Sequence, residues 1–275
     1  MPARSLPMTE IGGKAVSRLM CGTNMFFGHS HFSAARSKWL VRHFTMDRIV
    51  EVMHAAVEEG INCTVSGTIP QMPEAIERVR KLTGVKMVWF ATPGGNDFEE
   101  LKAGIRQSQE WGADFCMPHT SWTDSHLLVA ERQIVHAEET FALIRELGMG
   151  TGWSTHRPET IVVTDQAGYD CDCYIQPFNS IGFLCSVETD WVASIIRNAQ
   201  KPVISIKPLA SGRIMPPTGF PFVYENIKPV DTVAIGCLSP EEVEEDAKIV
   251  RNLLMGMEEE IELQKTRSKA ALAGS

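Results

Sequence analysis

The amino-acid sequence predicts an α/β protein that folds as a single (β/α)8 TIM barrel. Its 275 residues are close to the length of about 250 that such a barrel needs. Eight short, largely apolar segments alternate with segments of helical periodicity, which is the order expected of a parallel sheet covered by helices. Because no Pro-, Gly- or Ser-rich linker divides the chain, we expect residues 1–275 to form one domain.

A β-hairpin is predicted to precede the barrel. Apolar segments at 7–11 and 15–20 flank Gly12-Gly13, a dipeptide typical of a tight turn between antiparallel strands. The second segment continues into residues 21–24, where we expect the first barrel strand to end. Residues 25–45 mix polar and aromatic side chains without a clear period. We therefore expect them to form an ordered loop over the mouth of the barrel.

The rest of the chain predicts the other seven barrel strands and their helices. A helix over 46–59 is indicated by its Thr45 cap, its apolar face and Gly60 at its end. The last helix begins at Ser239-Pro240-Glu241-Glu242, a capping box with proline at the first helical position. The charged residues 258–275 are expected to form a helical tail. Strands are predicted at 61–65, 85–92, 115–117, 148–153, 172–176, 202–206 and 232–236; helices at 73–82, 97–111, 125–147, from Pro158, at 190–200 and at 222–227.

Composition and charge narrow the classes of partner. A net charge of -8 argues against a general nucleic-acid binder, and no apolar segment approaches the ~18 residues of a membrane span. The N-terminus lacks the apolar stretch of a signal peptide, so a cytoplasmic protein that acts on a small molecule is expected. The sequence does not determine whether the protein forms a homo-oligomer. The seven cysteines are expected to be reduced and mostly buried, and the pair Cys171 and Cys173 is only a weak metal motif.

Histidines at predicted strand ends are the strongest candidates for chemistry. His119 follows the fourth strand and His156 follows the fifth, and ligands bind at the carboxyl ends of parallel strands. With His31 from the mouth loop, they predict a site for Zn, Mn or Fe. Without a metal, His119 or His156 could act as a general acid or base. Lys207, at the end of the seventh strand, could form a Schiff base, stabilise charge or simply form a turn.

Motifs at 16–23, 55–62, 207–213, 230–236 and 239–246 are distributed over nearly the whole chain. Together they resemble the aldo/keto reductase family. The resemblance implies a nicotinamide cofactor, NAD(P)H, held by Ser154, Gln176 and Asn179 on the barrel floor. Ser239 would mark the helix start that holds the nucleotide end. It also implies reduction of carbonyl compounds by a proton relay of tyrosine, lysine and aspartate beside a histidine.

Three of the four catalytic positions of that family are replaced here. Val65 stands at the aspartate position, Ile69-Pro70 at the tyrosine position and Pro93 at the lysine position, whereas His119 remains. Proline and valine neither titrate nor donate a proton, so the proton relay of the family cannot operate through these positions. Trp122 and Trp153 are expected to line the mouth, whereas Trp89 and Trp191 are expected to pack in the interior.

The sequence leaves three functions open. The first is an enzyme that acts on a small hydroxy or carbonyl compound, such as one derived from a sugar. It would work by histidine-assisted elimination, isomerisation or hydration, with or without a metal. This reading follows from the replaced catalytic positions and the histidines at the strand ends. The second is an NAD(P)H-dependent oxidoreductase with a relocated proton donor such as His119, which the retained Ser154 and Gln176 suggest. The third is a non-catalytic binding or regulatory barrel.

Overall fold

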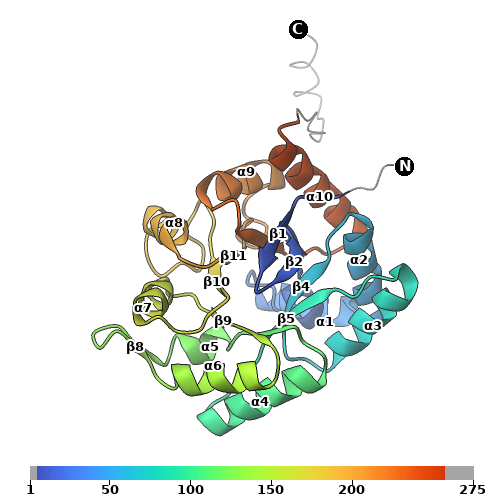
Figure 1. Cartoon of the computed structure of the whole chain (residues 1–275). Helices are drawn as coiled ribbons and strands as arrows, with labels where there is room; N and C mark the ends of the chain where they lie inside the picture. Colours follow the sequence, from blue (N-terminus) through green and yellow to red (C-terminus); the bar gives the residue numbers. More distant parts are fainter. Residues whose placement is uncertain (1–4, 258–275) are drawn as a thin grey trace.

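The computed structural model describes residues 5–257, and its centre is a closed barrel of parallel strands (Figure 1). Each strand pairs in parallel with its two neighbours, so all carboxyl ends meet at one rim. The predicted barrel is thus confirmed, and the predicted tail over 258–275 lies outside the described residues. In order around the barrel the strands are β3 (Leu19–Gly22), β4 (Cys63–Gly67), β5 (Val88–Thr92), β6 (Phe115–Cys116), β9 (Gly150–Ser154), β10 (Cys173–Pro177), β11 (Val203–Ile206) and β12 (Thr232–Ile235).

Helices surround this barrel (Figure 1). The cap predicted for α2 is formed, because the Thr45 side chain accepts a hydrogen bond from the backbone N–H of Arg48. Apolar residues of α2 such as Ile49 and Met53 are buried, as the period of the sequence requires. The surrounding helices are α2 (Met46–Glu58), α3 (Gln71–Thr83), α4 (Phe98–Glu110), α6 (Ala137–Glu146), α7 (Glu159–Ala167), α8 (Thr189–Asn198), α9 (Pro216–Asn226) and α10 (Pro240–Met255).

The N-terminal hairpin of β1 (Met8–Ile11) and β2 (Lys14–Ser17) closes the amino end of the barrel (Figure 1). Gly12 and Gly13 both have positive φ, which the two-residue turn requires. Ile11 and Val16 pack with interior barrel residues such as Phe115. The predicted return strand over 15–20 is wrong in one respect, since it breaks between β2 and β3.

Three segments differ from the sequence-based expectation. The predicted mouth loop over 25–45 holds two helices, η1 (Asn24–Phe27) and α1 (Ala34–His43), and Ser33 caps α1. The predicted helix over 125–147 forms only from Ala137. A short helix α5 (Thr120–Thr123) and a hairpin of β7 (Leu127–Leu128) and β8 (Gln133–Ile134) precede it. Helix α9 is longer than the predicted 222–227, because Pro216 and Pro217 suit its first turn.

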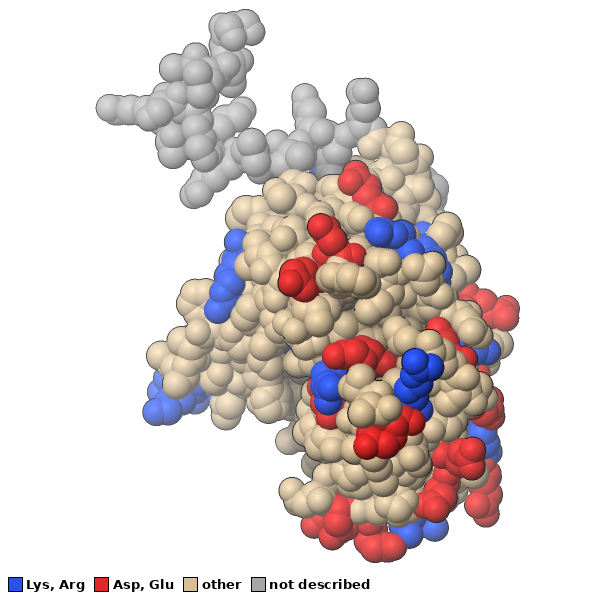
Figure 2. Space-filling model, turned by 90° about the vertical axis from the view of Figure 1, so that its left-hand side faces the viewer, with Lys and Arg blue, Asp and Glu red and all other residues tan. Residues whose placement is uncertain are grey.

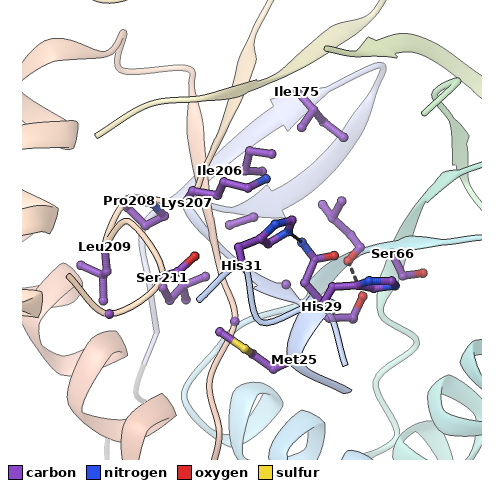
Figure 3. A pocket seen from close by; sticks show the side chains of 18 of the residues that line it. Met25, His29, His31, Ser66, Ile175, Ile206, Lys207, Pro208, Leu209 and Ser211 are labelled. Atoms are coloured by element: carbon purple, nitrogen blue, oxygen red, sulfur yellow. Dashed lines mark hydrogen bonds between the residues drawn. The ribbon is translucent and has the colours of Figure 1, made fainter. Parts of the chain in front are cut away.

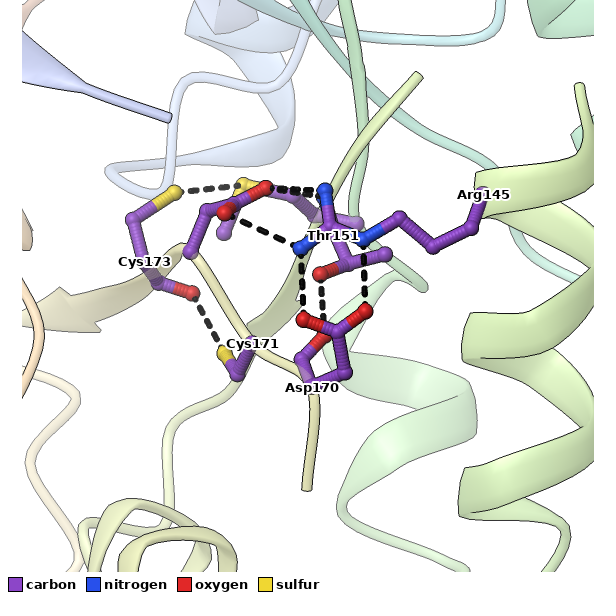
Figure 4. A network of polar contacts seen from close by, with 7 residues as sticks. Arg145, Thr151, Asp170, Cys171 and Cys173 are labelled. Atoms are coloured by element: carbon purple, nitrogen blue, oxygen red, sulfur yellow. Dashed lines mark hydrogen bonds and ion pairs between the residues drawn. The ribbon is translucent and has the colours of Figure 1, made fainter. Parts of the chain in front are cut away.

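An ion-pair network joins α6 to the amino ends of β9 and β10 (Figure 4). Arg145 donates two hydrogen bonds to the carboxylate of Asp170 and two to that of Asp172. Asp172 also accepts from the backbone N–H of Thr151, which fixes the register of the two strands. Cys171 and Cys173 lie beside this network as buried free thiols, and burial raises the pKa of both. They are therefore structural thiols and poor metal ligands in this state.

No helix within residues 5–257 is long and apolar enough to cross a membrane. On the face shown in Figure 2, basic and acidic side chains are interspersed and do not gather into a basic patch.

The interior of the barrel depends on a glycine. Phe90 and Phe115 stack with ring centroids 4.3 Å apart, and a Cβ atom added at Gly150 would overlap the Phe115 ring. We expect Gly150→Ala to lower the free energy of unfolding by about 1–3 kcal/mol, because the rings must shift in a close-packed core. Urea unfolding measures this. Gly94→Ala is the matched control, since its added Cβ meets no atom closer than 3.8 Å. Equal stability of both variants would contradict the prediction.

Candidate active site

A pocket of about 560 Å³ opens at the carboxyl ends of the barrel strands (Figure 3). A volume of this size suits a small-molecule or cofactor site. One end of its lining is basic, with imidazoles and an ammonium group at the strand ends. The other end reaches the first turns of α10. The residues that line it include His29, His31, Arg36, Val65, Ser66, Thr92, His119, Ser154, His156, Lys207, Ser211, Leu238, Glu242, Glu245 and Asp246.

His119 lies directly after β6 and caps α5. Its Nδ1 atom accepts a hydrogen bond from the backbone N–H of Ser121 at 3.2 Å and lies 2.9 Å from the Ser121 hydroxyl. The hydrogen of the neutral ring is therefore assigned to Nε2. Burial, followed by the charge of Lys207, lowers the pKa of His119. At neutral pH this side chain is an uncharged imidazole with one N–H to donate.

Lys207 and His156 form a close pair at the ends of β11 and β9. Lys207 Nζ lies 3.5 Å from His156 Nε2, so the ammonium group donates and the imidazole accepts. Burial lowers the pKa of Lys207 to about 8, and burial together with the charge of Lys207 lowers the pKa of His156 to about 4. Within residues 5–257, no carboxylate forms an ion pair with Lys207. The pair is thus positively charged at neutral pH and close to releasing a proton.

The segment just before α1, which contains His29 and His31, forms the outer edge of the pocket and is called the lip. His29 and His31 are exposed there, and Figure 3 shows His31 and Lys207 reaching toward the same part of the pocket. Asn24 Nδ2 lies 3.4 Å from His31 Nε2. Arg213 donates to the backbone carbonyls of Ala210 and His31, and its guanidinium lies over the rings of Phe32 and Phe183. These contacts tie the lip to the loop after β11.

The predicted metal site is not supported by this geometry. Within the described part of the chain, no three His, Cys, Asp or Glu side chains come together as a group able to hold a metal ion. His31 lies on the exposed lip beside Asn24, and the ammonium group of Lys207 lies beside His156. The proposed ligand set of His31, His119 and His156 therefore does not form here.

The predicted cofactor residues divide into two pairs. Ser154 lines the pocket, and its hydroxyl has no hydrogen-bond partner within residues 5–257. Gln176 is fully buried, and its Oε1 atom has no partner there either. Asn179 instead spends its side-chain amide on the backbone of Phe183, and Ser239 caps α10 by accepting from Glu242 N–H. Neither Asn179 nor Ser239 is among the residues that line the pocket, and their contacts with a cofactor stay a prediction.

The replaced catalytic positions are not restored from elsewhere in the chain. The sequence contains three tyrosines, all within the described residues, and none of them lines the pocket. Tyr174 donates to Asp165 and Tyr224 donates to the Arg18 carbonyl. Val65 lines the pocket at the position that the resemblance assigns to an acid. The pocket thus lacks a phenol, and the candidate proton donors at the strand ends are Lys207 and the imidazoles.

The tryptophan predictions were largely wrong. Trp122 and Trp153 are buried outside the pocket, where Trp122 stacks on His126 and Trp153 packs on Phe141. Trp191 was expected to be packed, but its side chain is 64% exposed. Only Trp89 is buried as predicted.

Two groups of pocket residues were not anticipated from the sequence. Arg36 of α1 lines the pocket near Gly212. Glu242, Glu245 and Asp246 line the far end, and burial with the neighbouring carboxylates raises the pKa of Asp246 to about 8. The spacing of these acids on one face of α10 was the available signal. The segment 239–246 had been interpreted as the helix start that holds the nucleotide end of a cofactor, without a role for its acids.

Comparisons with known proteins agree on the fold. No family model and no curated protein sequence matches the chain. Among solved structures, a Pseudomonas aeruginosa protein provisionally named an aldo-keto reductase matches at TM-score 0.67 and 16% identity over 92% of this chain and 98% of its own. A glycerol dehydrogenase from Gluconobacter oxydans matches at 0.61 and 14% over 97% and 100%. An aldo/keto reductase from Klebsiella pneumoniae in complex with NADP and acetate matches at 0.57 and 13% over 97% and 94%. The chain therefore has the fold of the aldo/keto reductases.

The depressed pKa of His156 predicts a pH dependence of stability. The folded state binds a proton on His156 less readily than the unfolded state, whose histidine pKa lies near 6.5. The free energy of unfolding should therefore fall as pH decreases from about 6.5 toward 4. Urea unfolding at several pH values measures this slope. His156→Gln should reduce it. An unchanged slope in His156→Gln would contradict the assignment.

Proposed function

We propose that the protein is an oxidoreductase that uses a nicotinamide dinucleotide to reduce a small carbonyl compound, with Lys207 as the proton donor. The observation that carries this proposal is a continuous pocket that is lined both by the Lys207–His156 pair and by the first turns of α10. Two structures of the same fold, a glycerol dehydrogenase and a reductase in complex with NADP, support it. The fold alone does not fix a chemistry, so the argument rests on the groups in the pocket.

The residues of the pocket fit a nicotinamide dinucleotide. The hydroxyl of Ser154 lines the pocket, and the unpaired Oε1 of Gln176 is buried in the neighbouring strand β10. Together they offer a donor and an acceptor of the kind that a carboxamide group requires. Leu238 and Glu242 at the start of α10 would contact the nucleotide end. When bound, the reduced dinucleotide supplies a hydride.

The chain would supply the proton and polarise the carbonyl group. His119 donates its Nε2–H to the carbonyl oxygen as a neutral imidazole, so it orients the substrate without transferring a charge. Lys207 is protonated at neutral pH, and its pKa of about 8 makes proton release easy. His156 holds the ammonium group in place through its Nε2 atom. Lys207 is therefore a better proton donor than His119, because the lowered pKa of His119 leaves its ring uncharged at neutral pH whereas Lys207 keeps its proton.

Elimination or isomerisation remains a second candidate, favoured by the same pair. Lys207 in its neutral form is a base beside the imidazole of His156, and a base of this strength can remove a proton next to a carbonyl group. The two functions differ in one measurable respect. Turnover of a hydroxy-carbonyl compound without any nicotinamide dinucleotide would favour elimination or isomerisation over reduction.

The first test measures the binding of NADH and NADPH to the intact protein by tryptophan fluorescence and by calorimetry. Saturable binding, together with dinucleotide oxidation in the presence of a panel of aldehydes, ketones and oxo acids, is expected. Absence of binding to either dinucleotide would remove the proposal.

Substitution of Lys207 tests the role of the proton donor. We expect Lys207→Met to lower kcat by about 10²–10⁴, the usual contribution of a general acid. In the wild type, kcat should fall as pH rises through about 8, because Lys207 then loses its proton. Lys38→Met, at an exposed position of α1, is the matched control and should keep wild-type kinetics. Loss of activity without loss of the pH dependence would assign the proton to another group.

The acidic end of the pocket predicts a preference between the two dinucleotides. Glu242 and Glu245 would repel a 2′-phosphate, whereas they can accept a hydrogen bond from a ribose hydroxyl. We therefore expect NADH to bind more tightly than NADPH. Glu242→Gln should reduce the ratio of the two dissociation constants several-fold. Calorimetric titration of the wild type and of Glu242→Gln with each dinucleotide measures these constants. Tighter binding of NADPH to the wild type would contradict the predicted contact.

A further inference from the structure

We infer that the carbonyl substrate carries a carboxylate next to its carbonyl group, as in a 2-oxo acid, and that Lys207 binds this carboxylate. The inference rests on the proposed function and names its substrate class. It begins from a half-buried positive charge that the described part of the protein leaves without a counter-ion.

The groups around Lys207 do not neutralise it. His31, His119 and His156 all have lowered pKa values and are uncharged at neutral pH. Burial raises the pKa of the Cys185 thiol, so this neighbour is also neutral. A charged group removed from water is costly unless it is paired. An anionic ligand in the pocket would supply the missing partner.

Asp124 is the acid behind the histidines, and it is already engaged. Its carboxylate accepts hydrogen bonds from the hydroxyls of Thr120 and Thr155 and from the backbone N–H of His156. It therefore holds the loop after β9 in place and does not reach Lys207. The acids at the far end of the pocket lie on α10.

The ammonium group of Lys207 has N–H donors that remain available to a ligand in the pocket. It carries three N–H bonds, of which one is directed to His156 Nε2. Two remain for the pocket. A 2-oxo acid can present its carbonyl oxygen and one carboxylate oxygen on the same side, so both can accept from one ammonium group. His119 Nε2–H adds a further donor for the carbonyl oxygen. Hydride addition to the carbonyl carbon and proton transfer from Lys207 to its oxygen would then give a 2-hydroxy acid.

The pyrophosphate of a dinucleotide is the other source of negative charge, and a different residue suits it. Arg36 lines the pocket, and its Nη1 atom lies 4.0 Å from the position of a Cβ on Gly212, in the loop after β11. Its guanidinium packs on the ring of Phe32 and has no carboxylate partner within residues 5–257. Lys207 lies with the histidines, where the reaction would occur. We therefore assign the substrate carboxylate to Lys207 and the pyrophosphate to Arg36.

Calorimetry with non-reducible probes tests this assignment without any turnover. The probes are oxamate, which has the shape and charge of a 2-oxo acid, its neutral counterpart oxamide, and ADP as a source of pyrophosphate. Oxamate should bind and oxamide should not. Lys207→Met should weaken oxamate binding by about thirtyfold or more, because a buried charge loses its partner. Arg36→Met should weaken ADP binding and leave oxamate binding unchanged, and Lys38→Met should change neither.

The wild-type protein gives a second measurement that needs no substitution. Oxamate affinity should fall as pH rises through about 8, where Lys207 loses its charge, and the fall should be absent in Lys207→Met. Equal binding of oxamate and oxamide, or oxamate binding that survives Lys207→Met, would overturn the inference. Loss of ADP binding but not of oxamate binding in Lys207→Met would assign the lysine to the pyrophosphate. Reduction of neutral aldehydes with no oxamate binding would leave the proposed function intact and reject only the carboxylate.

Discussion

The charge of Lys207 without a carboxylate partner is the constraint on which the interpretation of this pocket depends. The ammonium group lies beside His156 in a partly enclosed space, and its presence also lowers the pKa of His31 and His119. Burial is the larger cause of the lowered pKa of these imidazoles, and the charge of Lys207 adds to it, so the rings are uncharged at neutral pH. Neutral imidazoles donate and accept hydrogen bonds but carry no charge to compete with the lysine. Lys207 is therefore the charged group among the neutral imidazoles at the strand ends, and Arg36 of α1 is a second cation in the lining of the pocket.

The loop after β11 holds this charge in position through an unusual backbone. Lys207, Ala210 and Ser211 all have positive φ, a region that non-glycine residues seldom adopt. Arg213 bonds the carbonyls of Ala210 and His31 and lies over the rings of Phe32 and Phe183, so it restrains both the loop and the lip. Strain of this kind persists only where the surroundings enforce it, and it often accompanies function. The loop and the lip together therefore form a pre-organised boundary of the pocket.

The barrel was predictable from the sequence because its signals are local, whereas much of the site was not. Short apolar segments, the Thr45 cap and the Gly12-Gly13 turn each act within a few residues. Trp153 was misplaced because a parallel strand buried on both faces shows no alternation that distinguishes the inside from the outside. The hydrogen bonds of Asn179 and Ser239 to nearby backbone groups were not anticipated either, because side chains of this type can bond to a ligand or to their own backbone. The pKa of Lys207 depends on segments distant in the sequence, so no local pattern reveals it.

The replaced catalytic positions form a consistent set once their charges are considered together. The resemblance assigns an acid to position 65 and a lysine to position 93, and the chain has Val65 and Pro93 instead. Removal of one member of a buried ion pair leaves an unpaired charge, whereas removal of both leaves none. The double replacement is therefore tolerable for stability, but it deprives the pocket of a titratable donor. Lys207 returns a titratable cation to the same rim from β11, this time without an acid, and the proposed anionic substrate would supply the missing negative charge.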